Sequence, residues 1–279
     1  MNVKVVDLKA EYPFLAGGKL ECITGEYPFD LGDPKAWKRP AVVVVPGGGY
    51  GMVSKREGEP IAHAFLARGY QVFILTYLVE CDGVHYPEQL FELAAAVDYV
   101  KKNAEEFSVN PSEVFAVGFS AGGHLVGNLA VEHQNVSKKA GVDLDCSVSA
   151  VGLSYPVITS DHGHFASYVN LLSGYTDEAK AELFKTLNLD ESVSEQTPPA
   201  FIWATANDPV VPADNAIRFG LALAKQGIEY ELHIFPEGAH GLSTASIEIN
   251  TGSEDILRKV SVWIEDCASF FRRYTVEKY

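Results

Sequence analysis

Ser120 is the side chain best placed to act as a nucleophile. It is the central residue of G-F-S-A-G at 118–122, a G-x-S-x-G pattern between an apolar run at 114–117 and an apolar helical pattern. Glycines at both ends of the pattern allow a tight strand–turn–helix corner. Such a corner lifts the serine hydroxyl above a sheet and points the first helix amides toward it. The alternative interpretation is a glycine-rich turn that contains a serine by chance.

Asp208 and His240 are the candidates for the acid and the base that a serine nucleophile requires. Each follows an apolar run, so each stands just beyond the end of a predicted strand. Parallel strands bring their carboxyl ends to one edge of a sheet, where open α/β sheets bind ligands. Asp214 is the main rival carboxylate, but it falls inside the next predicted helix. We therefore predict Ser120 as nucleophile, His240 as base and Asp208 as its orienting acid.

The other seven of the eight histidines fit this base role less well than His240, which is flanked by glycines in a loop. His124 lies one turn into the predicted helix after Ser120, so we expect it to support that turn. The patterns around the remaining six predict two helical positions, one strand position and three loop positions that could line a pocket: His63 and His133, His233, and His85, His162 and His164.

A glycine-rich loop, P-G-G-G-Y-G at 46–51, follows the apolar run 41–45. Acyl transfer develops negative charge on a carbonyl oxygen, and removing one backbone donor to that oxygen costs about 3–4 kcal/mol. Glycines let bare backbone approach such an oxygen, so we predict Gly48, Gly49 and the amide of Ala121 as an oxyanion hole. The loop contains neither G-K-[ST] nor G-x-G-x-x-G, which makes phosphate binding a poor alternative.

Three tyrosines near predicted strand ends, Tyr50, Tyr77 and Tyr155, are candidates for lining the substrate side of the site. Aromatic residues at strand ends are more often packing residues, and that alternative stays open. The sequence has no H-E-x-x-H motif and no clustered Cys/His pattern. Neither a metal nor a nucleotide cofactor is therefore predicted.

Apolar runs of strand length alternate with longer segments of helical periodicity, which predicts a mostly parallel sheet covered by helices on both faces. About forty residues precede the first clear core strand. The predicted strands are 41–45, 72–75, 114–117, 148–153, 201–205 and 231–235. The predicted helices are 61–69, 87–100, one from about 120, 213–225 and 256–271. The irregular segment 156–199 is interpreted as an insertion over the carboxyl edge of the sheet, with a short helix near 177–187.

The composition and net charge of the chain argue against some classes of binding partner. The chain has 279 residues, 47% of them hydrophobic, with 22 Lys+Arg against 37 Asp+Glu and a net charge of −15. That negative field disfavours nucleic acid and anionic membrane surfaces. The four cysteines show no C-x-x-C spacing, and the start has no charged segment followed by an apolar stretch. These features favour a cytoplasmic protein without a membrane span. The oligomeric state is left open.

The motifs together resemble the α/β-hydrolase superfamily. G-F-S-A-G-G-H, P-G-G-G-Y, A-N-D-P and G-A-H-G are similar to motifs of small esterases related to the hormone-sensitive lipase group, and more narrowly of bacterial acetyl-esterase and acetyl-xylan-esterase-like proteins. The resemblance covers about 41–271 and implies an α/β-hydrolase fold. Pro46 stands where the lipase group has the histidine of H-G-G-G, a departure that favours the acetyl-esterase branch.

The expected function is hydrolysis of short-chain esters, chiefly acetyl esters of small carbohydrates, through an acyl-enzyme on Ser120. The expected partner is thus a small-molecule ester such as an acetylated sugar, and the whole chain 1–279 is interpreted as a single domain. Two alternatives stay open: an arylformamidase or small peptidase-type amide hydrolase, and a catalytically inactive binding protein of the same fold.

Overall fold

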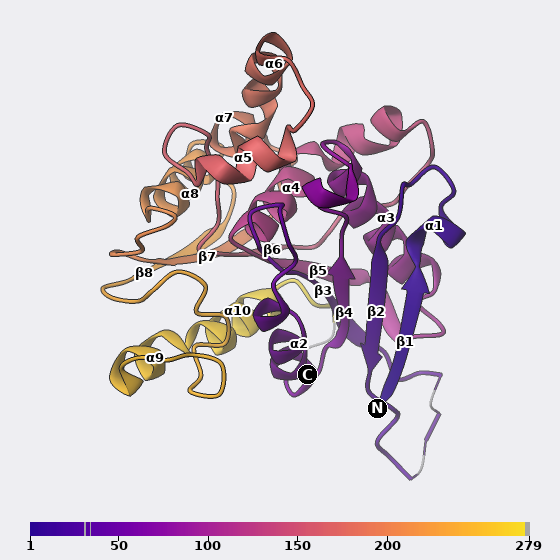
Figure 1. The fold of residues 1–279 in the computed structure, drawn as a ribbon. Coiled ribbons are helices and arrows are strands. Elements are labelled where there is room, and N and C mark those ends of the chain that lie inside the picture. Colours follow the sequence, from indigo (N-terminus) through magenta and orange to yellow (C-terminus); the bar gives the residue numbers. More distant parts are fainter. Residues whose placement is uncertain (31, 34, 277–279) are drawn as a thin grey trace.

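The predicted sheet is present as one mixed sheet (Figure 1). The computed structural model describes residues 1–30, 32–33 and 35–276, and its strands are β1 (Asn2–Asp7), β2 (Lys19–Thr24), β3 (Arg39–Val45), β4 (Gln71–Thr76), β5 (Val109–Phe119), β6 (Val151–Ser154), β7 (Ala200–Thr205) and β8 (Tyr230–Phe235). Their order across the sheet is β1-β2-β4-β3-β5-β6-β7-β8. β3 to β8 run parallel to one another, whereas β2 is antiparallel to both β1 and β4.

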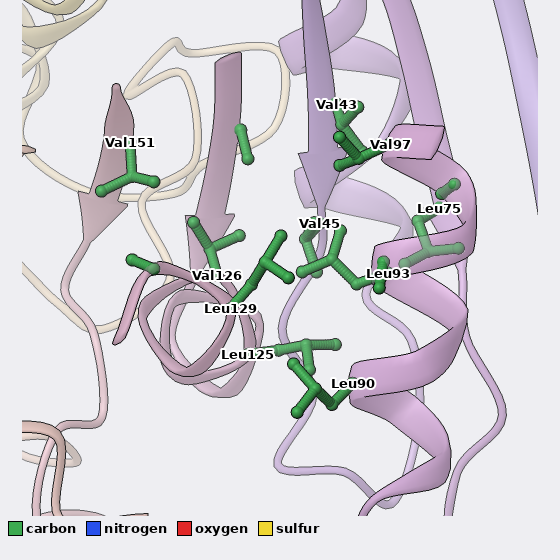
Figure 2. Packing of buried hydrophobic residues seen from close by; sticks show 14 of the residues in the cluster. Val43, Val45, Leu75, Leu90, Leu93, Val97, Leu125, Val126, Leu129 and Val151 are labelled. Carbon is green, nitrogen blue, oxygen red and sulfur yellow. The ribbon is translucent and has the colours of Figure 1, made fainter. Parts of the chain in front are cut away.

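Helices cover both faces of this sheet. On one face lie α3 (Glu88–Lys102), α4 (Ala121–Ala140) and α8 (Asp214–Lys225), and on the other lie α2 (Glu59–Leu66), α9 (Glu254–Val260) and α10 (Trp263–Arg272). Val43 and Val45 of β3 pack in the cluster with α3 and α4 (Figure 2), whereas Val42 and Val44 pack in the cluster with α2 and α10. A strand buried on both faces requires a continuous apolar run. The predicted α/β-hydrolase fold is confirmed.

An N-terminal hairpin precedes the first predicted strand. β1 and β2 pair antiparallel, with the short helix α1 (Leu8–Glu11) between them. β1 lies at the sheet edge, where Val3 and Val5 are 55% and 62% exposed and Val6 is its one buried residue. An edge strand needs no continuous apolar run, so this hairpin lacks the pattern that reveals β3.

The predicted C-terminal helix is two helices. α9 ends at Val260 and α10 begins at Trp263, with the half-exposed Val262 between them. Trp263 is fully buried, stacks on Trp203 with ring centroids 5.2 Å apart, and donates its indole N–H to Ser243 O at 2.9 Å. The chain turns between the two helices where this indole enters the core. Hydrophobic periodicity does not show such a turn, because the apolar stripe continues through it.

The segment 156–199 lies over the carboxyl ends of the strands (Figure 1). It contains α5 (Phe165–Leu171), α6 (Asp177–Leu187) and α7 (Leu189–Ser192), and α6 matches the predicted short helix. Asn215 of α8 fixes the start of this segment, since its buried Oδ1 accepts hydrogen bonds from the amides of Ile158 and Thr159 at 2.9 and 3.3 Å. The 3₁₀ turns η1 (Lys55–Glu57) and η2 (Glu80–Asp82) follow β3 and β4.

Candidate active site

Ser120 stands at a sharp corner between β5 and α4. Its φ of 53° and ψ of −118° form a conformation that costs a non-glycine residue about 1–3 kcal/mol. Two glycines make the corner possible. A Cβ on Gly118 would collide with the carbonyl oxygen of Gly122, and a Cβ on Gly122 would collide with carbonyl oxygens at the end of β3. The packing therefore explains why glycines are needed on both sides of the serine.

The structure brings Ser120, His240 and Asp208 together in one hydrogen-bonded chain. His240 Nδ1 lies 2.7 Å from Asp208 Oδ2, and His240 Nε2 lies 2.9 Å from Ser120 Oγ. Because a carboxylate accepts hydrogen bonds, Nδ1 carries the proton and Nε2 is free to accept the serine O–H. This is the arrangement in which an imidazole removes a serine proton as the hydroxyl attacks.

Asp208 is held rigidly behind His240. Its side chain is fully buried, and its second oxygen, Oδ1, accepts hydrogen bonds from the amides of Val210 and Val211 at 2.8 and 3.0 Å. Every bond to the carboxylate thus comes from a donor, which compensates the burial of its charge. The rival Asp214 lies elsewhere, paired with His162 Nδ1 at 3.2 Å.

The predicted oxyanion donors lie beside this chain. Gly48 and Gly49 line the same cavity as Ser120, and their φ values of 124° and 63° are backbone conformations that favour glycine. Ala121 is the first residue of α4, where an amide has no acceptor inside its own helix. Among the described residues, none of the three amides donates a hydrogen bond to the protein. The geometry leaves these donors available to a ligand.

A cavity of about 380 Å³ opens over Ser120 and His240, within the size range of small-molecule sites. Its wall combines the glycine loop, the turn after it, α5 and the loops after β7 and β8. The residues lining it are Gly48, Gly49, Met52, Ser54, Arg56, Glu57, Ser120, His164, Asn170, Val210, His240 and Gly241.

The three tyrosines proposed for the substrate side are buried to 2% exposure or less and are not among the residues that line this cavity. Each hydroxyl is engaged within the protein. Tyr77 donates to Pro46 O at 2.9 Å, Tyr50 pairs with His124 Nδ1 at 2.8 Å, and Tyr155 donates to Glu57 Oε1 at 2.8 Å. The structure thus places Tyr50, Tyr77 and Tyr155 behind the site, where they support its loops.

His124 supports the site as a structural residue, although its ring bonds the glycine loop and the end of α6 and not the turn at Ser120. Its Nε2 lies 2.9 Å from Leu187 O, a carbonyl that only accepts, so Nε2 carries the proton. Burial lowers the pKa of His124 to about 4, which keeps the ring neutral, and Nδ1 then accepts the Tyr50 O–H. The ring thereby connects the glycine loop to the end of α6.

His164 is the loop histidine that the structure brings into the cavity wall. Its Nδ1 lies 3.0 Å from Ser167 Oγ, and burial together with the neighbouring His240 lowers its pKa. His162 instead lies at the surface between Asp161 and Asp214. His85 packs edge-on against Tyr175 and is absent from the cavity lining among the described residues.

Sequence reasoning did not single out Met52, Arg56, Glu57, Asn170 or Val210 as cavity residues. Asn170 donates to Gly49 O at 2.8 Å, and Glu57 is a carboxylate only 4% exposed. No spacing rule connects Glu57 and Asn170 to Ser120, because their contacts with Tyr155 and Gly49 are distant in sequence. The one available signal was the position of 52–57 directly after the glycine loop.

Neither a metal-binding group nor a membrane-crossing helix is found in residues 1–30, 32–33 and 35–276. Within them, no three His, Cys, Asp or Glu side chains are grouped so that they could hold a metal ion. No helix there is both long enough and apolar enough to traverse a bilayer. All four cysteines are free thiols, of which Cys81 is exposed.

Comparisons with known proteins agree with this geometry. Residues 30–223 match the BD-FAE family. The chain is 36% identical over 221 residues to endo-1,4-beta-xylanase B of Butyrivibrio fibrisolvens and 33% identical over 211 residues to an acetylxylan esterase of Xylanibacter ruminicola. These matches cover 77% and 72% of this chain but only 34% and 40% of the two relatives.

Solved structures are similar to this chain over nearly its whole length. An acetyl ester-xyloside bifunctional hydrolase from Caldicellulosiruptor lactoaceticus is 28% identical, with a TM-score of 0.79 over 97% of this chain and 96% of that one. A carboxylesterase from Lactobacillus plantarum matches all of both chains with a TM-score of 0.85 at 24% identity, which supports the fold alone. The resemblance to α/β-hydrolase esterases is confirmed. The chain belongs to the BD-FAE family, and its fold is that of the α/β-hydrolases.

Proposed function

We propose that this chain is a serine carboxylesterase that hydrolyses short-chain esters, in particular acetyl esters of carbohydrates, through an acyl-enzyme on Ser120. The observation that carries the proposal is the unbroken chain from Ser120 Oγ to His240 Nε2 at 2.9 Å and from His240 Nδ1 to Asp208 Oδ2 at 2.7 Å. A serine hydroxyl has little nucleophilicity without such a base. Because all three residues are present and hydrogen-bonded to one another, a catalytically inactive binding protein is disfavoured.

The first half-reaction transfers the acyl group to Ser120. As Ser120 Oγ attacks the ester carbon, His240 Nε2 takes the serine proton and the carbonyl π pair moves to the oxygen. The amides of Gly48, Gly49 and Ala121 donate to that oxyanion, and Asp208 stabilises the imidazolium. Collapse of the tetrahedral intermediate breaks the bond to the alcohol oxygen, which receives the proton from His240.

The second half-reaction repeats these steps with water. His240 removes a proton from water as the water oxygen attacks the acyl carbon, and a second oxyanion forms at the same amides. Its collapse breaks the bond to Ser120 Oγ and returns the proton to that oxygen. The carboxylic acid leaves, and the free enzyme is restored. No step requires an electron donor or acceptor.

The nature of the cavity supports a small acyl group on a polar alcohol. Beside Met52 and Val210, its wall carries the polar side chains of Ser54, His164 and Asn170. A polar wall gives hydroxyl groups hydrogen-bond partners, whereas a long acyl chain needs an apolar tunnel. The names of two relatives, an acetylxylan esterase and an acetyl ester-xyloside hydrolase, point to the same substrate class.

Chain-length preference tests the proposal. We expect p-nitrophenyl acetate to be cleaved much faster than p-nitrophenyl octanoate, and acetylated xylose or xylo-oligosaccharides to release acetate. Ser120→Ala should abolish turnover without changing the circular dichroism spectrum, and a fluorophosphonate should label Ser120. Equal cleavage of both esters would refute the short-acyl claim. Absence of labelling would favour a binding protein, and faster cleavage of an arylformamide would favour an amide hydrolase.

A further inference from the structure

Glu57 is a carboxylate in the cavity wall that the Ser–His–Asp chain does not use. It is 4% exposed, and both of its oxygens are occupied by donors from two different parts of the site. We propose that Glu57 is a positioning residue, which fixes the oxyanion loop and the His240 loop relative to each other through the hydrogen-bonded chain Gly47–Glu57–Tyr155–Ser243. This inference rests on the esterase function proposed above.

On the oxyanion side, Glu57 Oε2 accepts a hydrogen bond from the Gly47 amide at 2.8 Å. Gly47 also packs directly against the nucleophile corner, because a Cβ there would lie 2.9 Å from the Cβ of Ser120. The next two residues are the predicted oxyanion donors. A rotation at Gly47 would therefore move the amides of Gly48 and Gly49 relative to Ser120 Oγ, and Glu57 opposes that rotation.

On the histidine side, Glu57 Oε1 accepts the Tyr155 O–H at 2.8 Å, and the Tyr155 oxygen in turn accepts the Ser243 amide at 3.0 Å. Ser243 belongs to the loop that carries His240, and its hydroxyl donates back to the carbonyl of Arg56, the neighbour of Glu57. The Tyr155 ring packs edge-on against the His240 ring with centroids 5.1 Å apart. One carboxylate thus bonds the oxyanion loop directly and the His240 loop through Tyr155.

Backbone strain at two residues of this hydrogen-bonded chain supports a functional role for it. Tyr155 and Ser243 have φ values of 38° and 54°, left-handed conformations that are costly for residues other than glycine. Ser120 shares this property with a φ of 53°. Strained residues cost about 1–3 kcal/mol each and cluster where the surrounding structure must hold a reactive geometry. The two strained residues are the ones through which Glu57 reaches the His240 loop.

Replacement by glutamine breaks this chain while keeping its volume. A carboxylate accepts from both donors, whereas glutamine has a single acceptor oxygen. Its NH₂ group either meets the Gly47 amide as a donor–donor contact, or donates to the Tyr155 oxygen and leaves the buried Tyr155 O–H without its acceptor. Misplacement of catalytic groups by about 1 Å costs on the order of a hundredfold in rate. We expect Glu57→Gln to lower kcat for p-nitrophenyl acetate about tenfold to hundredfold, with KM changed less than about threefold.

Tyr155→Phe removes the next link and should lower kcat about threefold to tenfold with the same small effect on KM. Because both changes act on one chain, the double variant should lose less than the product of the two single losses. Tyr70→Phe is the matched control, since its buried hydroxyl donates to Ala268 O at 3.0 Å away from the cavity. We expect its kcat to stay within twofold of the wild type.

Fluorophosphonate labelling of Ser120 in the wild type separates the two claims. If the wild type is neither labelled nor active, the esterase function fails. If the wild type is labelled and active but Glu57→Gln keeps its kcat within twofold of the wild type, only the positioning role is overturned. The positioning role is also overturned if Tyr70→Phe lowers kcat as much as Glu57→Gln does. Should circular dichroism show Glu57→Gln unfolded, Tyr155→Phe decides: an unchanged kcat overturns the role, and a selective fall in kcat supports it.

Discussion

The corner around Ser120 and the segment 156–199 face each other across the same cavity but are held by different means. The corner is fixed by backbone against backbone, since Cβ atoms on Gly118 and Gly122 would collide with carbonyl oxygens. The segment 156–199 is joined to the corner by backbone at its start, where the Val157 amide donates to Ser120 O at 3.2 Å, but it lines the cavity with the side chains of His164 and Asn170, and Asn170 donates to Gly49 O. The proposed reaction geometry thus lies where no atom can be added, and the wall that we propose to meet the alcohol consists of side chains that can change.

We expect the largest loss of stability and activity from a substitution at the Ser120 corner, because an added Cβ has no space there. In Gly122→Ala the new Cβ would meet the carbonyl oxygens of Val45 and Pro46 at the end of β3, so the start of α4 beside Ser120 must shift away from β3. We expect the free energy of unfolding to fall by about 3 kcal/mol and kcat to fall at least about a hundredfold. Urea denaturation and p-nitrophenyl acetate kinetics measure the two quantities.

Gly141→Ala is the control for this change. Gly141 ends α4 with a φ of 70°, and a Cβ there would have no neighbouring heavy atom within 4 Å, so the substitution adds only conformational strain. We expect a loss of about 1 kcal/mol and an unchanged kcat. If Gly122→Ala behaved like Gly141→Ala, the close packing of the corner would be irrelevant to catalysis.

A buried carboxyl group outside both regions should affect the stability of the protein without affecting the geometry of the site. Glu92 of α3 is fully buried, and burial raises its pKa from 4.5 to about 8. The folded state therefore binds a proton between these pH values that the unfolded state does not, and stability falls as pH rises from about 4.5 to 8. The contribution is about 1.4 kcal/mol per pH unit.

Glu92→Gln should remove this slope, because the amide does not titrate and its oxygen can still accept the Leu78 amide that Glu92 Oε2 accepts at 2.8 Å. Urea denaturation at pH 5, 6, 7 and 8 measures the slope in wild type and variant. Activity at each pH should be similar in the two proteins, because Glu92 is not among the cavity residues. Parallel pH profiles of stability would show that Glu92 does not titrate in this range.

The same contrast explains which features could be predicted from the sequence. Ser120, Asp208 and His240 each follow a strand, so local patterns plus the convergence of parallel strands were enough to predict that they meet. Glu57 and Asn170 were not predicted because their hydrogen-bond partners are distant in sequence: Glu57 bonds Tyr155, and Asn170 bonds Gly49. Such pairs produce no periodic pattern in the sequence. The break between α9 and α10 and the edge hairpin were missed for related reasons, since one depends on a tertiary contact and the other lacks a buried run.

We expect the smallest effect on activity from a substitution in the cavity wall formed by the segment 156–199. His164 lines the cavity, and its lowered pKa keeps the ring neutral near pH 7, so it can exchange hydrogen bonds with a sugar hydroxyl without adding charge. We expect His164→Gln to raise KM for acetylated xylo-oligosaccharides about threefold to tenfold, with kcat for p-nitrophenyl acetate within twofold. His162→Gln, at the surface beside Asp214, should change neither value. An equal loss on both substrates would mean that His164 acts on the reacting atoms, and the division between a fixed corner and a variable wall would fail.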